Sequence, residues 1–367
     1  MELPAYLKVM SDKGASDLYL STGASVMLKV EGKTGPVTKK PLPAGAVKEL
    51  AYSVMSDKQR AEFEKNLELD MALGISQLGR FRVNVFLQRG EVAMVIRHLK
   101  TEIPSIEALG LPGILEQLIM EPRGLILVVG ATGSGKSTTL AAMIDHRNSH
   151  KTGHILTIED PIEYIYHHKR SLVNQREVGV DTLSYAEALR HAMREAPDVI
   201  MIGEIRDRET MKQALTYAET GHLCIATLHA SNVDQTMRRI VNFFPENAHR
   251  ELFMDLSMHL KAVVSQRLLK GKDGKRSAAV EVMLASPYIR DLINKGETEG
   301  IGEIMEKSPE QGMKTFDQAI LELYHQGKIT EEEALANADS RHNLEVKLRL
   351  EHGNPGADDS QFSMDQS

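Results

Sequence analysis

Residues 130–138 combine glycines, a lysine and hydroxyl side chains in an order that suits the binding of an anion. The string reads Gly-Ala-Thr-Gly-Ser-Gly-Lys-Ser-Thr and fills every fixed position of the pattern G-x-x-x-x-G-K-[ST]. Glycines let the backbone turn its N–H groups inward, and the N-terminus of a following helix favours negative charge. The pattern therefore predicts a loop that holds the phosphates of a nucleoside triphosphate such as ATP.

Side chains of this loop have separate expected roles. Lys136 is expected to reach the outer phosphates, and Ser137 is expected to ligate Mg²⁺. The other expected phosphate-binding residues are Gly130, Ala131, Thr132, Gly133, Ser134, Gly135 and Thr138. The alternative is a Gly/Ser turn that binds nothing, and phosphate binding alone does not establish hydrolysis.

Acidic residues follow two further apolar runs. The string at 158–163, Ile-Glu-Asp-Pro-Ile-Glu, ends in Glu163, which could orient and polarise an attacking water. Gly203 stands where many phosphate-loop enzymes carry an Asp, so Glu204 is the remaining acid for catalysis and for the metal site. Mg²⁺ would then depend on Ser137, the phosphates and water, which suits an ion that keeps several waters. An exposed acidic turn and a structural glutamate are the alternatives.

Two histidines bracket the fourth apolar run, at 223–227. His222 precedes the run and His229 follows it. At about 3.3 Å per strand residue they lie too far apart to act on one atom, which disfavours a shared metal. One is expected to sense phosphate and the other to couple a loop, and a structural role is the alternative for each.

Arginines are the remaining candidates for binding the nucleotide, because a planar guanidinium suits the charge of a γ-phosphate. A surface or salt-bridging role is the alternative for each. The candidates are Arg190, Arg194 and Arg206, which flank the run before Glu204, and Arg80, Arg82 and Arg97 in the N-terminal hairpin.

These residues need a sheet that brings strand ends together. Helical stretches separate the apolar runs, which predicts a parallel sheet covered on both faces, with a helix over 137–147 directly after the loop. The four runs are 125–129, 154–158, 198–202 and 223–227.

The regions around this sheet are expected to form further units. Residues 1–100 predict a compact α+β domain with strands near 17–20 and 26–30, helical spacing over 46–66 and a hairpin over 79–98. Turn formers mark a linker at 101–113 before a nucleotide-binding core at 114–285. Beyond the fourth run, we expect a long helix at 246–270, a strand at 278–284, short helices over 286–350 and a disordered polar tail at 351–367.

Composition narrows the class of protein. The 367 residues suit two domains, and a formal charge of −7 offers no general attraction to nucleic acid or anionic lipid. One cysteine, Cys224, excludes an internal disulfide framework and a Cys-rich zinc site, and its apolar neighbours predict a buried core thiol. The N-terminus does not read as a secretory signal, and no run approaches the ~18 apolar residues that span a bilayer, so a cytoplasmic protein is expected.

Taken together, the motifs resemble the secretion ATPases of type II secretion and type IV pili, and within them the pilus retraction ATPases. The resemblance covers residues from about 5 to 350. It rests on the strings at 16–18, 79–84, 130–138, 158–163, 196–207, 220–222, 227–229, 266–268, 312–317 and 337–340.

This resemblance implies a hexameric ring whose subunits pair a PAS-like N-terminal domain with a RecA-like ATPase domain and C-terminal helices. It assigns Glu163 to the Asp box, Glu204 to the Walker B box, and His222 with His229 to the His box. Arg82 and Arg97 would reach the nucleotide from the N-terminal domain. The implied partners are a pilus platform protein of the inner membrane and a related retraction ATPase, at the cytoplasmic face of that membrane.

The chain departs from the usual retraction ATPase at two strings. Residues 287–293 read Pro-Tyr-Ile-Arg-Asp-Leu-Ile in place of an Ala-Ile-Arg-Asn-Leu-Ile-like string, and Tyr19 stands where His is frequent. These departures favour the accessory retraction ATPase of the family over the principal one. Two other functions stay open: an ATP-sensing regulatory partner of a related motor, and, against the acidic charge, a nucleic-acid translocase.

Overall fold

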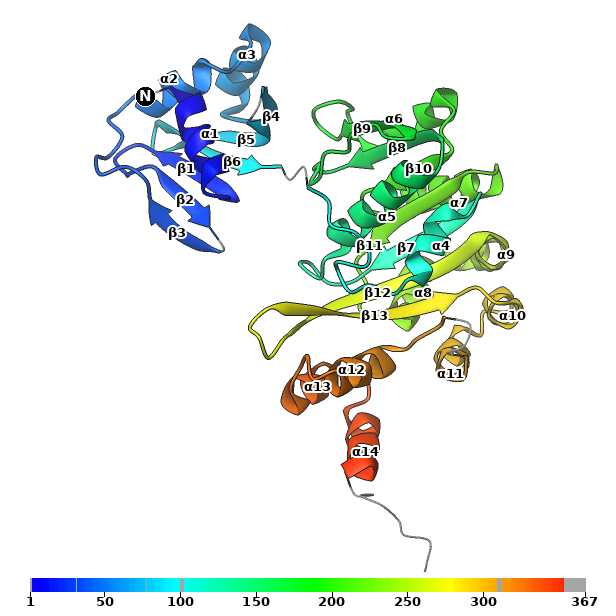
Figure 1. The fold of residues 1–367 in the computed structure, drawn as a ribbon. Helices are drawn as coiled ribbons and strands as arrows, with labels where there is room; N and C mark the ends of the chain where they lie inside the picture. The colour runs from blue at the N-terminus through cyan, green and yellow to red at the C-terminus, as the bar shows by residue number, and fades with distance from the viewer. Residues whose placement is uncertain (1, 31, 77, 100–101, 309–311, 353–367) are drawn as a thin grey trace, which may run out of the picture. The chain divides into compact units, whose positions relative to one another are not determined.

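The structure is a computed structural model that describes residues 2–30, 32–76, 78–99, 102–308 and 312–352 (Figure 1). By compactness the chain divides into two units. Unit 1 comprises Met1–Ile103 and Thr152–Pro197, and unit 2 comprises Pro104–Lys151 and Asp198–Ser367. The domain boundaries expected from the sequence stay a prediction, and most of the expected polar tail lies outside the described residues.

The first part of unit 1 is a six-stranded antiparallel sheet with three helices. Its strand order is β3-β2-β1-β6-β5-β4. The strands are β1 (Asp17–Ser21), β2 (Met27–Val30), β3 (Lys33–Pro36), β4 (Glu68–Ile75), β5 (Gly79–Gln88) and β6 (Glu91–His98), and the helices are α1 (Leu3–Asp12), α2 (Ala46–Tyr52) and α3 (Asp57–Asn66). The expected hairpin over 79–98 is confirmed.

Alternating side chains of this sheet build its core. Phe81, Val83 and Val85 are fully buried on one face of β5, against Leu3 and Leu7 of α1 in the same hydrophobic cluster. The opposite face of the same strand carries the polar side chains of Arg80, Arg82 and Asn84. The helical spacing over 46–66 proves to be two helices, because Ser56 caps α3 by accepting a hydrogen bond from the Gln59 amide.

The second part of unit 1 comprises Thr152–Pro197. It contains β8 (Gly153–Glu159), β9 (Ser171–Glu177), α6 (Tyr185–Ala192) and the short 3₁₀ helix η1 (Met193–Glu195). The strands β8 and β9 are parallel, with Glu159 beside Glu177 at their carboxyl ends.

The sheet of unit 2 consists of four parallel strands and one antiparallel edge strand, β13, and its central strands are buried on both faces. Its strand order is β13-β12-β7-β11-β10. These five are β7 (Gly124–Val129), β10 (Val199–Ile202), β11 (Leu223–Leu228), β12 (Leu260–Lys270) and β13 (Arg276–Leu284). All residues of β7 and β11 are buried, which explains their unbroken apolar runs and confirms the expected parallel sheet.

Helices connect these strands. They are α4 (Ile114–Met120), α5 (Lys136–His150), α7 (Arg208–Glu219), α8 (Val233–Asn242), η2 (Glu246–Ala248) and α9 (His249–His259). Asp207 and Asn232 cap α7 and α8, since each side chain accepts a hydrogen bond from a first-turn amide.

The prediction of one long helix at 246–270 is wrong. The helix α9 ends at His259, and Leu260–Lys270 forms β12, parallel to β7 on one side and antiparallel to β13 on the other. A strand buried on both faces has no alternation, so its apolar run can match a helical period as well. The strand expected at 278–284 is confirmed within β13.

The C-terminal part of unit 2 is helical, as expected. Its elements are α10 (Pro287–Lys295), η3 (Thr298–Gly300), α11 (Ile301–Glu306), α12 (Phe316–His325), α13 (Glu331–Asn337) and α14 (Arg341–His352). A separate small core joins α12, α13 and α14 to β12 and β13, with Phe316 and Leu344 fully buried. Within the described ranges, none of the helices combines the length and apolar character that crossing a bilayer requires.

Candidate functional site

The glycine-rich loop of unit 2 has the strand, loop and helix context that its sequence predicts. It follows β7, and α5 begins at Lys136. Gly130, Gly133 and Gly135 have φ values of 155°, 79° and 92°. A Cβ on Gly130 would lie 2.6 Å from the Gln266 carbonyl oxygen, and one on Gly135 would lie 2.8 Å from the Gln266 Nε2 atom. Backbone conformation and close approach together require glycine at these two positions.

Polar groups of the loop suit phosphate oxygens. The Lys136 ammonium is buried and donates to the carbonyl oxygens of Gly130, at 2.8 Å, and Ala131, at 2.9 Å. The Ser134 hydroxyl is buried and has no hydrogen-bond partner among the residues that the structure describes. Ser137 is half-buried in the first turn of α5. A cation, a hydroxyl donor and a glycine turn at a helix N-terminus fit the phosphates of a nucleotide.

Three strands of unit 2 end at the same edge of the sheet as this loop. Val129 of β7 pairs with Leu228 of β11, and Ala226 of β11 pairs with Ile202 of β10, all in parallel. The loop, His229 and Glu204 therefore follow neighbouring strand ends, about 4.8 Å apart per strand. This is the edge at which open parallel sheets hold ligands.

Glu204 lies between two partners at this edge. Its Oε2 atom is 2.6 Å from Arg206 Nε, and its Oε1 atom is 3.1 Å from His229 Nε2. The carboxylate is 17% exposed, which strengthens these contacts relative to a fully hydrated pair. The Thr227 hydroxyl donates to the Gly203 carbonyl at 2.5 Å, which fixes the turn that carries Glu204.

In unit 1, the acidic string after β8 divides into a buried and an exposed carboxylate. Glu163 is exposed, whereas Glu159 is only 8% exposed and accepts hydrogen bonds from Thr157 Oγ1 (2.6 Å) and Gln175 Nε2 (3.2 Å). Burial raises the pKa of Glu159 to about 7, against the hydrogen bonds that lower it, including one from the Glu163 backbone N–H. Glu159 is therefore part of the core, whereas Glu163 is the accessible carboxylate of this string.

The loop that carries Glu163 is held from two strand ends. Glu159 bonds the Glu163 amide, and Glu177 Oε2 accepts from the Ile162 amide at 3.1 Å. The Gln175 side chain adds contacts to the Tyr164 carbonyl and the Tyr166 amide. Sequence reasoning missed these supporting residues, although a glutamate ending an otherwise apolar strand was a visible signal of a buried carboxyl group.

The arginine candidates differ in their surroundings. Arg82 and Arg97 are cross-strand neighbours on one face of the N-terminal sheet, and each has a carboxylate partner: Asp70 at 3.6 Å and Asp17 at 2.9 Å. Arg194 is exposed in η1. Arg206 forms an ion pair with another predicted site residue, Glu204.

His222 lies at the other edge of the unit 2 sheet. It precedes the amino end of β11, where its carbonyl accepts from the Gly124 amide at 3.0 Å and its Nδ1 atom lies 3.1 Å from Thr220 Oγ1. His229 follows the six residues of β11, seven steps along the chain, which corresponds to about 23 Å at about 3.3 Å per residue. The structure does not bring His222 to the loop of its own unit.

Two further observations concern metal and thiol chemistry. Among the residues that the structure describes, no group of three or more His, Cys, Asp or Glu side chains is placed to hold a metal ion. The assignment of Mg²⁺ to Ser137 and Glu204 stays a prediction. Cys224 is fully buried in β11, and this burial raises the pKa of its thiol, in agreement with the expected core thiol.

Comparison with known proteins places this chain in a family. Residues 3–277 match the model of the Type II/IV secretion system protein family. The chain is 51% identical to the type IV pilus ATPase PilU of Pseudomonas aeruginosa, over 95% of this chain and 92% of that protein. It is 43% identical to the type IV pilus retraction ATPase PilT of the same organism, over 92% of this chain and 98% of that protein.

Solved structures agree with this placement. A crystal structure of the pilus retraction motor PilT with bound ADP has a TM-score of 0.88 and 44% identity, covering 94% of this chain and 99% of that one. The Legionella pneumophila ATPase DotB has a TM-score of 0.77 and 28% identity, covering 90% and 92%. These matches confirm the expected fold, an N-terminal domain followed by a RecA-like ATPase domain. The chain belongs to the Type II/IV secretion system protein family, among the type IV pilus retraction ATPases of the PilT and PilU group.

Proposed function

We propose that this chain is an ATP-hydrolysing motor subunit that powers type IV pilus retraction and twitching motility. One observation carries the proposal: the glycine-rich loop and the Glu204–His229 pair follow neighbouring strand ends at one edge of the unit 2 sheet. The family supports the same activity, because its relatives are named as ATPases of pilus machines and one is named as a twitching motility protein.

The proposed chemistry assigns a task to each polar group. Lys136 holds the outer phosphates, and Ser137 with Glu204 holds Mg²⁺, which when bound neutralises phosphate charge. Glu163 orients the attacking water, and His229 holds the Glu204 carboxylate in place. Arg206 neutralises charge on the γ-phosphate after leaving Glu204. Positioning and charge neutralisation of this kind account for most of the catalysis of phosphoryl transfer.

The proposed assembly is a ring of six subunits. In it, Arg82, Arg97, Arg194 and His222 contact the nucleotide from outside the loop. Two features support these assignments: Arg82 and Arg97 share one sheet face, and His222 is far along β11 from the loop of its own unit. The ring would act on a pilus platform protein at the cytoplasmic face of the inner membrane, alone or with a related ATPase.

Identity favours the accessory member of the group, because the chain is 51% identical to PilU and 43% identical to PilT of one organism. An ATP-sensing partner of a related motor is therefore the second candidate function. Twitching that persists when this chain can bind but not hydrolyse ATP would favour that second function.

Lys136→Ala tests the motor proposal. Loss of the ammonium should weaken ATP binding and abolish hydrolysis, and cells that carry only this variant should lose twitching. Lys212→Ala is the control, because Lys212 is an exposed residue of α7 in the same unit. Normal ATP affinity and hydrolysis in Lys136→Ala would contradict the loop assignment.

A further inference from the structure

Arg267 in β12 connects the loop after β11 to the C-terminal helices. Its Nη1 atom donates to the Asn337 carbonyl at 2.8 Å, and its Nη2 atom donates to the Ser231 carbonyl at 3.3 Å. The same Nη2 atom forms an ion pair with Asp339, and the guanidinium lies 4.0 Å from the centroid of the Phe316 ring. One side chain thus bonds the loop that follows His229 and the turn that precedes α14.

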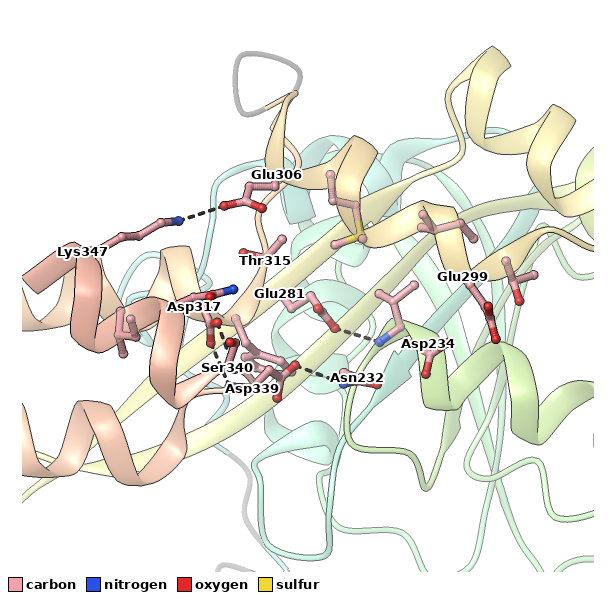
Figure 2. Close-up of a pocket in the computed structure, with 18 residues that line it drawn as sticks. Asn232, Asp234, Glu281, Glu299, Glu306, Thr315, Asp317, Asp339, Ser340 and Lys347 are labelled. Carbon is pink, nitrogen blue, oxygen red and sulfur yellow. Dashed lines mark hydrogen bonds and ion pairs between the residues drawn. The ribbon is translucent and has the colours of Figure 1, made fainter.

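Asp339 completes this connection. Its Oδ2 atom accepts from Asn232 Nδ2 at 3.0 Å, while its backbone N–H donates to Asp317 Oδ1 at 2.8 Å, as Figure 2 shows. Asp317 also accepts from the Ser340 amide at 3.1 Å. The Asp339 carboxylate is therefore held by Arg267 and by the cap of α8, while its backbone N–H is held by Asp317.

A third contact fixes the same loop from β13. Buried Glu281 accepts a hydrogen bond from the Val233 amide at 2.8 Å, beside a cavity of about 340 Å³ between α8 and the C-terminal helices (Figure 2). Three successive residues, Ser231 to Val233, are thus bonded by Arg267, Asp339 and Glu281 in turn. His229 is two residues before the first of them.

The neighbouring residue of β12 serves the phosphate loop. Gln266 is buried, its Oε1 atom accepts from Thr139 Oγ1 at 2.6 Å, and its atoms set the close approach at Gly130 and Gly135. Adjacent residues of one strand therefore support both parts of the proposed site, with Gln266 at the loop and Arg267 at the residues after His229.

We propose that Arg267 and Asp339 are positioning residues for His229, so that the His229–Glu204 contact is organised only while α12, α13 and α14 are docked on β12 and β13. This inference rests on the proposed ATPase function. A shift of about 1 Å in a catalytic group can cost about a hundredfold in rate, so loosening Ser231 and Asn232 should lower kcat. Nucleotide binding should change little, because the phosphate loop keeps Gln266.

Arg267→Lys is the most informative variant. Lysine keeps the positive charge but has one nitrogen in place of a planar fork, so it cannot bond Ser231, Asn337 and Asp339 together. We expect kcat for ATP to fall about ten- to a hundredfold, with KM within about twofold and the melting temperature nearly unchanged. Arg238→Lys is the matched control, because Arg238 lies on α8 with exposed ion pairs to Asp234 and Glu299.

Variants of the two partners separate positioning from folding. Asn232→Ser keeps an α8 cap but loses the Nδ2 donor, so it should also lower kcat. Asp339→Asn keeps an oxygen that can accept from Asn232, and it should retain more activity than Asp339→Ala. Equal kcat for wild type, Arg267→Lys and Asn232→Ser would overturn the inference.

Amide hydrogen exchange of the full-length chain distinguishes this inference from the proposed function. In Arg267→Lys, residues 229–236 should exchange faster than in wild type, while residues 130–142 stay unchanged. If the wild type hydrolyses no ATP, the proposed function fails, and the exchange result still reports on the contact. Unchanged exchange at 229–236 in Arg267→Lys would refute the positioning role by itself.

Discussion

The buried carboxyl group of Glu159 should make the stability of the protein depend on pH, and Glu159→Gln should remove that dependence. Burial raises the pKa of Glu159 from 4.5 to about 7, and the nearby Glu163 carboxylate acts in the same direction. When the pKa of a group is higher in the folded state than in the unfolded state, the group stabilises the folded state. This stabilisation is complete at pH values below the pKa of the unfolded state. That contribution is lost as the pH rises through the folded pKa.

The size of the effect follows from the shift. A difference of about 2.5 pKa units at 1.36 kcal/mol per unit corresponds to about 3 kcal/mol, lost between about pH 4.5 and about pH 7. Glutamine has nearly the same shape and can still accept from Thr157 through its amide oxygen. The variant should therefore fold and should become more stable than the wild type above about pH 7.

Urea unfolding, followed by circular dichroism, measures the free energy of unfolding at each pH. Circular dichroism is used because the chain has no tryptophan for fluorescence. The free energy of unfolding of wild type minus that of Glu159→Gln should fall by about 3 kcal/mol from about pH 5 to about pH 8. Glu281→Gln is the matched comparison in unit 2, where burial also raises the pKa to about 7. A difference between wild type and Glu159→Gln that does not change with pH would refute the reasoning.

Glycine substitutions test the phosphate loop, and labelling with a thiol reagent tests the core. Gly135→Ala should weaken binding of a fluorescent ATP analogue by about tenfold or more, because a left-handed φ costs roughly 1–2 kcal/mol and the new Cβ meets Gln266. Gly133→Ala has the same kind of φ with nothing within 4 Å, so its loss should be smaller; equal losses would contradict the role of Gln266. Cys224 should react with a thiol reagent only after unfolding, because it is fully buried, and rapid labelling of the folded protein would show that β11 is accessible.

Local sequence signals were sufficient for the phosphate loop and for the parallel strands. The glycine positions of 130–135, the continuous apolar run of β7 and the acid after β10 each have a physical cause that acts within a few residues. The same holds for the β5–β6 hairpin, where alternation of apolar and polar residues matches the observed burial.

Features that depend on tertiary contacts were not visible in the sequence. Leu260–Lys270 is a strand because β7 and β13 flank it, and its own period does not decide between strand and helix. Glu159 is buried because Thr157 and Gln175 satisfy it, and Gln175 comes from another strand. The contacts of Arg267 join residues far apart in the chain, so its sequence string alone gave no indication of its role.

The central claim is that Glu204 serves hydrolysis at a loop that binds ATP independently of it. Steady-state ATPase rates and ATP-analogue affinity of Glu204→Gln, measured on the same assembled preparation, test this most directly. The account predicts that kcat falls by about a hundredfold or more while analogue affinity stays within a few-fold of wild type. An unchanged kcat, or a loss of activity explained entirely by lost binding, would contradict it.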